Sequence, residues 1–355
     1  MVGSQLGLAP DLEPEIPTVV APGVPGRRGH IHPAALFVLK RLAAGVLTLL
    51  VVSVLIFICT SVIPGNAAVI TLGKSATASS IQRLETTLGL NRPLYQQYLS
   101  WLGGILHGSF GDSAVALAHH QVNPSIASSI KNPFVNSFIL GGITAILLIP
   151  LTLVLGVLTG IKANKAVDHA ISLPSLVIAG LPEFVTGSLL IYIFFSELNI
   201  LPPVSLVPPG QSPLSTPKIL ILPVLTLLAV AVGSGIRQVR LGMIEVLQTD
   251  FVQFARLNGI SERRVLIRYG MRNAIANSIQ TIAQNLQYLV GGIIVVEAVF
   301  AYPGIGTYLV NAVLARDTNE VLAASIILAA LYTVINIGAD LLVVFLVPKL
   351  RTELV

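Results

Sequence analysis

Five side-chain amides recur along one apolar stretch of the chain, at intervals of four and three residues. They are Asn273, Asn277, Gln280, Gln284 and Gln287. This spacing places them on one face of an α-helix, and an amide both donates and accepts hydrogen bonds without carrying a charge. We predict that this face lines a path for a polar solute such as a peptide. The alternative is that the amides bond to neighbouring helices, as buried amides often do in membranes.

Three carboxylates lie within or near apolar stretches. Glu183 follows a proline, Glu297 lies close to the end of the amide-bearing stretch, and Asp340 lies one turn beyond an asparagine. Acids in such surroundings are costly, so each one is a functional hypothesis that requires a partner. We favour a structural pairing or a gate for these residues over a proton relay. Direct contact with a substrate is a further alternative.

Patterns that could bind a nucleotide or a metal are incomplete. The letters "LGKS" at residues 72–75 imitate the end of a phosphate-binding loop, but its first glycine would fall at Ala68. His119 and His120 are adjacent, which does not place both rings on one helical face, and no cysteine or carboxylate cluster accompanies them. We therefore expect no catalytic, cofactor-binding or metal-binding residue. Any energy must come from an ion gradient or from a partner.

The elements that position these residues are apolar helices. Hydrophobic residues make up 54% of the chain and its mean hydropathy is +0.84. Several segments approach or exceed the roughly 20 apolar residues that cross a bilayer core as a helix, and none alternates polar and apolar residues as a strand would. The sequence predicts an all-α, polytopic membrane protein with six spans, at about 42–63, 134–161, 171–195, 219–236, 275–300 and 321–347.

The basic residues predict the orientation of these spans. With the N-terminus in the cytoplasm, most lysines and arginines fall in segments on the cytoplasmic side, seven of them arginines between Arg237 and Arg272. Both termini are then cytoplasmic, and the basic balance reflects topology and not nucleic-acid binding. We expect residues 1–33 to be a disordered cytoplasmic tail and the first span to be an uncleaved anchor. Cys59 is alone in that span, where we expect a packing role.

The long loop over residues 64–133 is predicted to lie outside the cytoplasm and to contain two short helices. Ile81, Leu84 and Leu88 follow a serine cap at helical spacing, Gly89 ends this first helix, and a second begins at Pro93. These helices suit the outer membrane surface. They could either cap the packing of the spans or dock a soluble partner.

The loop over residues 237–274 carries the remaining local signals. A short helix is expected with Phe251, Phe254 and Ala255 on one face; Gly259 ends it, and Ser261 can cap a second helix. Exposed aromatics ringed by arginines suit insertion into a groove of a partner protein. They equally suit a helix that rests on anionic lipid.

The stretch "DFVQFARLNGISERRVLIRYGMRNA" resembles the EAA loop of ABC-importer permeases, in the form found in dipeptide and oligopeptide permeases. The similarity extends over all but about the first 33 residues. It includes "LGLNRPLYQQYLSWLGGILHGSFGDS" in the outer loop, "LPEFVTGSLLIYIF" in the third span, "VVEAVFAYPGIGTYLVNAVLARD" after the fifth and "NIGADLLVVFLVPKLR" in the sixth. The chain is similar to the B-type peptide permease subunit of this family.

The resemblance implies a six-span type I importer permease in the inner membrane of a prokaryote. It implies half of a heterodimeric pore, with a homologous second permease subunit, an external solute-binding protein and two cytoplasmic ATPase subunits or domains. ATP and magnesium would bind those partners, so this chain would not be an enzyme. The residues expected to couple it to the ATPases are Phe251, Phe254, Ala255, Gly259, Arg263 and Arg264.

Two other functions remain open. A nickel or other small-solute permease of the same family is the first, although the amide face lacks His and Cys. An autonomous proton-coupled transporter using Glu183 or Asp340 is the second. The basic loop with its glycine argues against the latter, because such a carrier needs no cytoplasmic docking element, and no inverted repeat is visible between the halves.

Overall fold

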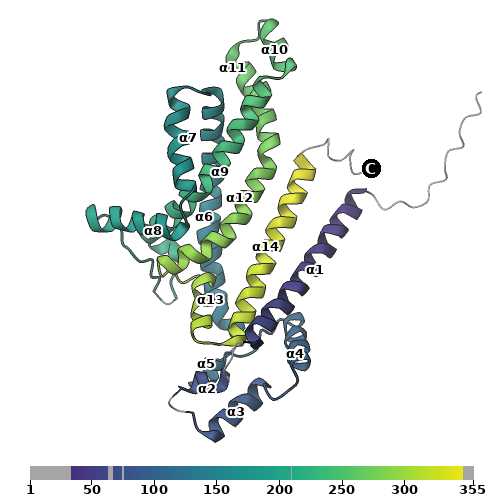
Figure 1. Cartoon of the computed structure of the whole chain (residues 1–355), viewed down its shortest axis with the longest axis vertical. Coiled ribbons are helices and arrows are strands. Elements are labelled where there is room, and N and C mark those ends of the chain that lie inside the picture. Colours follow the sequence, from purple (N-terminus) through teal and green to yellow (C-terminus); the bar gives the residue numbers. More distant parts are fainter. Residues whose placement is uncertain (1–32, 63–66, 74–75, 209, 347–355) are drawn as a thin grey trace, which may run out of the picture.

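The computed structural model describes residues 33–62, 67–73, 76–208 and 210–346, and within them every regular element is helical (Figure 1). The expected tail lies outside this part of the chain, apart from Pro33. The long helices are α1 (Pro33–Val62), α6 (Ile126–Ile161), α9 (Ile221–Leu247), α12 (Arg272–Val299) and α14 (Thr318–Leu346). The all-α fold predicted from the sequence is confirmed.

Five helices within the described residues are long and apolar enough to cross a membrane: Leu36–Ser61, Ile126–Ile161, Pro217–Leu247, Ile282–Val299 and Thr318–Leu341. The predicted third span at 171–195 is not one straight helix. It consists of α7 (Ala166–Ala179) and α8 (Glu183–Ile191), the latter continued by a π-helical turn (Tyr192–Glu197), and the pair is bent by 109°. Counted together as one span, the pair gives the expected six.

The bend follows from the residues at the break. Pro182 has no backbone N–H to donate to the preceding turn, and the residue before a proline is pushed away from helical geometry. The hydropathy averaged over residues 171–195 shows that both halves are apolar, but it carries no information on a change of helix direction. The sequence therefore predicted one straight span.

The core lies where α6, α9 and α12 meet. Helix α9 contributes most of it, including Leu222, Leu227 and Ile236, and α12 contributes Leu289 and Val296. Helix α7 packs on α9, whereas α14 and α1 pair beside this core (Figure 1).

Two glycines bring α6 and α9 into close contact. A Cβ atom at Gly156 would lie 2.5 Å from the Cβ of Val239, and one at Gly160 would lie 2.6 Å from the Cβ of Met243. The spacing is the small-xxx-small pattern that lets helix backbones approach in membranes.

The two ends of the molecule differ. One end holds α2 (Ala67–Leu72), α3 (Ala78–Leu88), α4 (Leu94–Leu106) and α5 (Ala114–Ala118), and the opposite end holds α10 (Asp250–Leu257) and α11 (Glu262–Arg264) (Figure 1). Both short helices predicted for residues 64–133 are present. Gly89 ends α3 with a φ of 68°, and Pro93 precedes α4. The side chain that caps α3 is Thr77 and not a serine, because the Thr77 hydroxyl accepts from the backbone N–H of Ser80.

The segment between the fourth and fifth spans is more helical than expected. Helix α9 continues to Leu247, beyond the predicted end of the fourth span at residue 236. From Glu262 the chain then runs as one uninterrupted helix through α11, a π-helical segment (Val265–Met271) and α12. Helices α2, α5 and α13 (Ile305–Leu314) were not predicted at all. Each is short, and α2 and α5 have 6 and 5 residues, too few to show a clear periodicity.

Candidate functional site

One face of α12 carries polar and small groups through the apolar bundle. Asn273 and Gln284 are exposed, and Gln287, three residues beyond Gln284, is half-buried. Tyr288, 53% exposed, and Gly291 continue this face toward the far end of the helix. The side chains of Asn277 and Gln280 lie outside the described residues. Leu289 and Val290 point into the core on the other side, so the described part of α12 has one open polar face and one packed apolar face.

A different amide on α12 bonds to a neighbouring helix. Asn285 is buried, and its Oδ1 accepts a hydrogen bond of 3.0 Å from the Ser234 hydroxyl of α9. Gly235 permits this approach, because a Cβ there would lie 2.7 Å from the Asn285 Nδ2 and 2.5 Å from the Cγ2 of Thr152 on α6. Sequence reasoning passed over Asn285 because it lies off the stripe of five amides. Asn285 follows Gln284 directly and so lies about 100° round the helix from it. That offset was the one sign in the sequence that Asn285 faces a different neighbour.

Glu183 begins α8 at the bend of the third span. Its Oε1 accepts a hydrogen bond of 2.7 Å from the hydroxyl of Tyr288, and a Cβ at Gly292 would lie 3.3 Å from the same oxygen. A carboxylate in the first turn of a helix is also favoured by the helix dipole. Glu183 therefore lies next to the open face of α12, and its position joins α8 to that face.

Glu297 is completely buried where α6, α12 and α13 meet. The Ser137 hydroxyl donates to its Oε1 at 2.5 Å, and the backbone N–H of Gly306 donates to its Oε2 at 2.7 Å. Ser137 in turn accepts from the backbone N–H of Ile305 at 2.7 Å. The carboxylate thus satisfies the otherwise unpaired N–H groups at the start of α13. Gly304 leaves room for it, because an added Cβ would overlap the carboxylate.

Asp340 pairs with Arg41. The Arg41 Nε lies 3.1 Å from the Asp340 Oδ2, and the two side chains are 47% and 27% exposed. The ion pair joins α14 to α1, away from the open face of α12. Of the three acids singled out from the sequence, Glu183 alone lies beside that face, and Glu297 and Asp340 bind other helices.

A buried ion pair that the sequence did not reveal lies at the α10–α11 end of α7. Asp168 is 1% exposed and holds Arg240 of α9 in two hydrogen bonds, Nε to Oδ1 at 2.8 Å and Nη2 to Oδ2 at 2.7 Å. Ser172 and the backbone N–H of Asn164 each donate to the same carboxylate at 2.8 Å. The sequence marks Arg240 only as one of the basic residues that indicate topology. No local pattern connects two residues so far apart in the sequence.

The end formed by α10 and α11 exposes apolar side chains. Phe251 is 45% exposed, Phe254 67% and Leu257 84%, all on one face of α10. Ala255, predicted to lie beside Phe251 and Phe254, is not part of this exposed surface. It is buried with Val252 in a cluster that includes Met243, Val246 and Val265. Sequence reasoning did not include Leu257, although it lies three residues beyond Phe254.

The turn after α10 is fixed by a glycine and an ion pair. Gly259 has a φ of +75°, which favours glycine over any residue with a side chain. Arg256 closes the turn by two hydrogen bonds to Glu262, at 2.8 and 3.1 Å, and it lowers the pKa of that carboxyl below its usual value. Ser261 stands at the start of α11 but makes no side-chain capping bond there, contrary to prediction. Arg263 and Arg264 follow it on the exposed surface.

The incomplete phosphate-loop pattern and Cys59 do not belong to the α10–α11 end. Leu72 and Gly73, the first half of "LGKS", lie at the end of α2, on the side of the molecule opposite α10. Lys74 and Ser75 lie outside the described residues. Among those that the structure describes, no group of three or more His, Cys, Asp or Glu is placed to hold a metal ion. Cys59 is exposed on α1, so it does not pack against other residues of this chain as expected.

The five long apolar helices and the bent α7–α8 pair define a polytopic membrane protein. Residues 152–352 match the family described as the binding-protein-dependent transport system inner membrane component, and residues 35–148 match the N-terminal region of that family. The chain belongs to this family. It is the permease component of an ABC importer, as the resemblance of its basic loop implied.

Relatives extend over nearly the whole chain. A protein of Brucella abortus (strain 2308), named as a peptide transport system permease, is 31% identical over 316 residues, which cover 89% of this chain and 99% of the relative. A protein of Sinorhizobium fredii named as a peptide ABC transporter permease is 29% identical over 321 residues, 89% of this chain and 99% of the relative. The permease of a metal-staphylopine import system in Staphylococcus aureus is 31% identical over 319 residues, 89% and 98% of the two chains.

Proposed function

We propose that this chain forms one half of the pore of an ATP-driven importer for dipeptides or oligopeptides, together with a homologous second permease subunit. The exposed polar face of α12, with Gln284, Gln287 and Tyr288, supports this proposal most directly. Peptide backbones present N–H and C=O groups along their whole length, and an amide and hydroxyl surface offers matching donors and acceptors without holding one charge tightly. The names of the relatives from Brucella and Sinorhizobium agree with this substrate class.

The apolar face of α10 is the proposed contact with the ATPases. Phe251, Phe254 and Leu257 stand out from the end of the bundle, and Arg263 and Arg264 lie close along the chain. A few apolar anchors with arginines nearby are the usual composition of a strong protein interface. On this proposal ATP and magnesium bind two cytoplasmic partner subunits or domains, and this chain contributes no catalytic residue or cofactor site.

The orientation follows from that contact. If α10 and α11 face the cytoplasm, both termini are cytoplasmic and the end with α2–α5 faces outward, where an external solute-binding protein delivers the substrate. In this orientation most lysines and arginines lie in cytoplasmic segments, as is usual for membrane proteins. Glu183 then lies at the level of the bend, beside the path, where it can interact with a positively charged group on the substrate.

Import of a metal complex is the second candidate, because one relative is named as a permease for metal-staphylopine. The two candidates differ in the ligand that stimulates transport. Purified complex in proteoliposomes, supplied with its solute-binding protein, should take up labelled peptide in an ATP-dependent manner. Uptake of a chelated metal but of no peptide would replace the first candidate by the second, and uptake driven by a proton gradient without ATP would exclude both.

The ATPase contact can be tested with a matched pair of leucines. Leu257, 84% exposed on α10, and Leu314, 78% exposed at the end of α13, carry the same side chain at opposite ends of the molecule. A double change of Phe254 and Leu257 to alanine should weaken binding of the ATPase subunits by about thirtyfold, the effect of losing roughly 2 kcal/mol from an interface hot spot. Leu314→Ala should leave that binding unchanged. Equal binding by the two variants at equal membrane abundance would rule out α10 as the docking site.

The proposed path can be tested by cysteine labelling in a Cys59→Ser background. A cysteine at Gln284, which is exposed, should react with a small water-soluble thiol reagent, because the thiolate forms only where water has access. A cysteine at Leu289, 4% exposed, should react slowly. The rate at position 284 should change when the transporter is trapped with nucleotide. Similar slow rates at both positions would assign the polar face of α12 to helix contacts and not to the path.

A further inference from the structure

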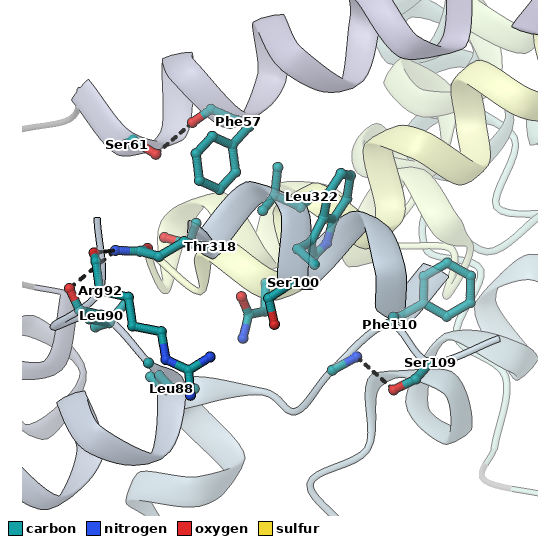
Figure 2. A pocket seen from close by; sticks show the side chains of 16 residues that line it. Phe57, Ser61, Leu88, Leu90, Arg92, Ser100, Ser109, Phe110, Thr318 and Leu322 are labelled. Carbon is teal, nitrogen blue, oxygen red and sulfur yellow. Dashed lines mark hydrogen bonds between the residues drawn. The ribbon is translucent and has the colours of Figure 1, made fainter. Parts of the chain in front are cut away.

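A cavity of about 230 Å³ lies where the α3–α4 helices meet the ends of α1 and α14. Phe57 and Ser61 contribute from the last turns of α1, and Thr318 and Leu322 from the first turns of α14. Figure 2 shows Phe57 entering this space from α1, with Arg92 on the side of the α3–α4 helices. The cavity lies at the opposite end of the bundle from α10, and neither the path nor the ATPase contact uses it.

The lining offers hydrogen-bond donors and one positive charge. Arg92 forms no ion pair with any described residue. The Nε1 of Trp101 is buried without a hydrogen-bond partner, which is costly for an indole N–H unless a ligand or water fills the gap. The hydroxyl of Ser109 accepts from the backbone N–H of Gly111, so its own proton remains available. The described lining residues include no aspartate or glutamate.

This chemistry selects an anion. An arginine fork with neighbouring N–H and O–H donors matches the oxygens of a phosphate group, and no carboxylate among the described lining residues competes for Arg92, which is exposed to an incoming group. The volume of about 230 Å³ is below the roughly 300–1,000 Å³ of sites for drug-sized ligands, so a compact group fits better than a peptide.

The surroundings of the cavity point to a lipid as the source of that phosphate. Ser61 lies in the last turn of the first span and Thr318 is the first residue of the last, so the cavity lies at the level where the bilayer core ends. Trp101 and Tyr98 face each other with ring centroids 6.0 Å apart, and tryptophan and tyrosine are enriched at this depth. Along α1, apolar side chains lead away from the cavity on an exposed surface that suits an acyl chain: Val51, Val54, Leu55 and Ile58.

We propose that this cavity binds the phosphate headgroup of an anionic phospholipid in the outer leaflet, with Arg92 as counter-ion and Trp101 Nε1 as a donor. The leaflet assignment rests on the orientation given under the proposed function, and the binding itself does not. The bound headgroup links α4 to α1 and α14. Direct side-chain contact between α4 and α1 is otherwise carried by Tyr98, which shares a hydrogen bond of 2.8 Å with Ser53 and packs edge-on against Phe57 at 5.3 Å.

The chain contains its own reporter, because Trp101 is its one tryptophan. The full chain is placed in two series of phosphatidylcholine nanodiscs. One series contains increasing fractions of brominated phosphatidylglycerol and the other contains increasing fractions of brominated phosphatidylcholine. The quenching of Trp101 fluorescence is measured in both. Half-maximal quenching should need about fivefold less brominated phosphatidylglycerol than brominated phosphatidylcholine. One basic residue near the membrane surface attracts an anionic lipid by about 1 kcal/mol, which corresponds to this ratio.

Three variants and one competitor decide the result. Arg92→Gln should abolish the preference and Arg92→Lys should retain most of it, whereas Arg83→Gln, on the exposed surface of α3, should not change it. Equal quenching by both lipids, or an unchanged preference in a monodisperse Arg92→Gln chain, would overturn the proposal. A shift of Trp101 emission on adding inorganic phosphate to the lipid-free chain in detergent would assign the cavity to a free anion instead. None of these measurements requires transport, so they succeed or fail independently of the proposed function.

Discussion

The contact between α6 and α9 predicts that two alanine substitutions in the same helix will differ in their effect on stability. At Gly156, a new Cβ would lie 2.5 Å from the Val239 Cβ, 2.7 Å from its Cγ1 and 3.2 Å from the carbonyl oxygen of Ile236. Carbon atoms in contact prefer a separation of about 3.5–4.0 Å, so the two backbones would have to move apart by roughly an ångström. At Gly142, in the same helix, no heavy atom lies within 4 Å of the added Cβ.

The magnitudes separate the two variants. Alanine is favoured over glycine inside a helix by about 1 kcal/mol, and this gain applies to both positions. Overpacking a tight contact costs about 1–3 kcal/mol, and this cost applies to Gly156→Ala only. Gly142→Ala should therefore be neutral or slightly stabilising, and Gly156→Ala should be less stable than it by about 1–3 kcal/mol.

The assay is the temperature at which the purified chain in detergent loses its monodisperse elution peak, measured side by side for the parent and both variants. A Gly156→Val change adds two further methyl groups at the same contact and should lower that temperature more. If Gly156→Ala and Gly142→Ala retain the same thermal stability, the close approach of α6 and α9 does not exist in the membrane protein, and the reasoning from small residues fails.

Three further substitutions test the ion pairs and the buried carboxylate by the same thermal assay. Asp168→Asn leaves Arg240 largely buried with only neutral acceptors and should cost about 3 kcal/mol, whereas the control Asp168→Glu should cost less if it keeps the pair. Arg41→Gln should change stability by less than about 1 kcal/mol, because its pair with Asp340 is half-exposed; a large loss would mean that this pair is buried in the assembled complex. Glu297→Gln turns one of the two acceptor oxygens into an N–H₂ donor, against either the Ser137 hydroxyl or the Gly306 N–H, and should cost about 1–3 kcal/mol; a variant as stable as the parent would show that two acceptor oxygens are not needed there.

Features with a local chemical cause could be predicted from the sequence. Gly89 and Gly259 end helices because their backbones adopt φ values of 68° and 75°, which glycine alone accepts without strain. Pro93 marks the start of α4 because its missing N–H would be unpaired there in any case. The long apolar helices were predictable for the same reason, since a bilayer imposes a length and a composition on each segment.

Features that depend on a neighbour in space could not be predicted. The partners of Glu183 and Asp168, which are Tyr288 and Arg240, lie far away in the sequence, and nothing local selects them. The face of α10 that carries Ala255 is buried because Met243 and Val265 cover it, and an eight-residue helix has too few positions for its own pattern to decide which face that is.

The uninterrupted helix from Glu262 to Val299 joins the α10–α11 end and the buried Glu297 in one continuous rod. At about 1.5 Å per residue the rod is roughly 55 Å long. Rotated about one end, such a rod acts as a lever, so a tilt of about 5° at the end near α10 displaces the other end by about 5 Å. That displacement is close to the rise of one helical turn. Because Glu297 holds the start of α13 at the far end of this helix, we expect that a small movement at α10 shifts α13 at the opposite end of the molecule when the helix moves as one body.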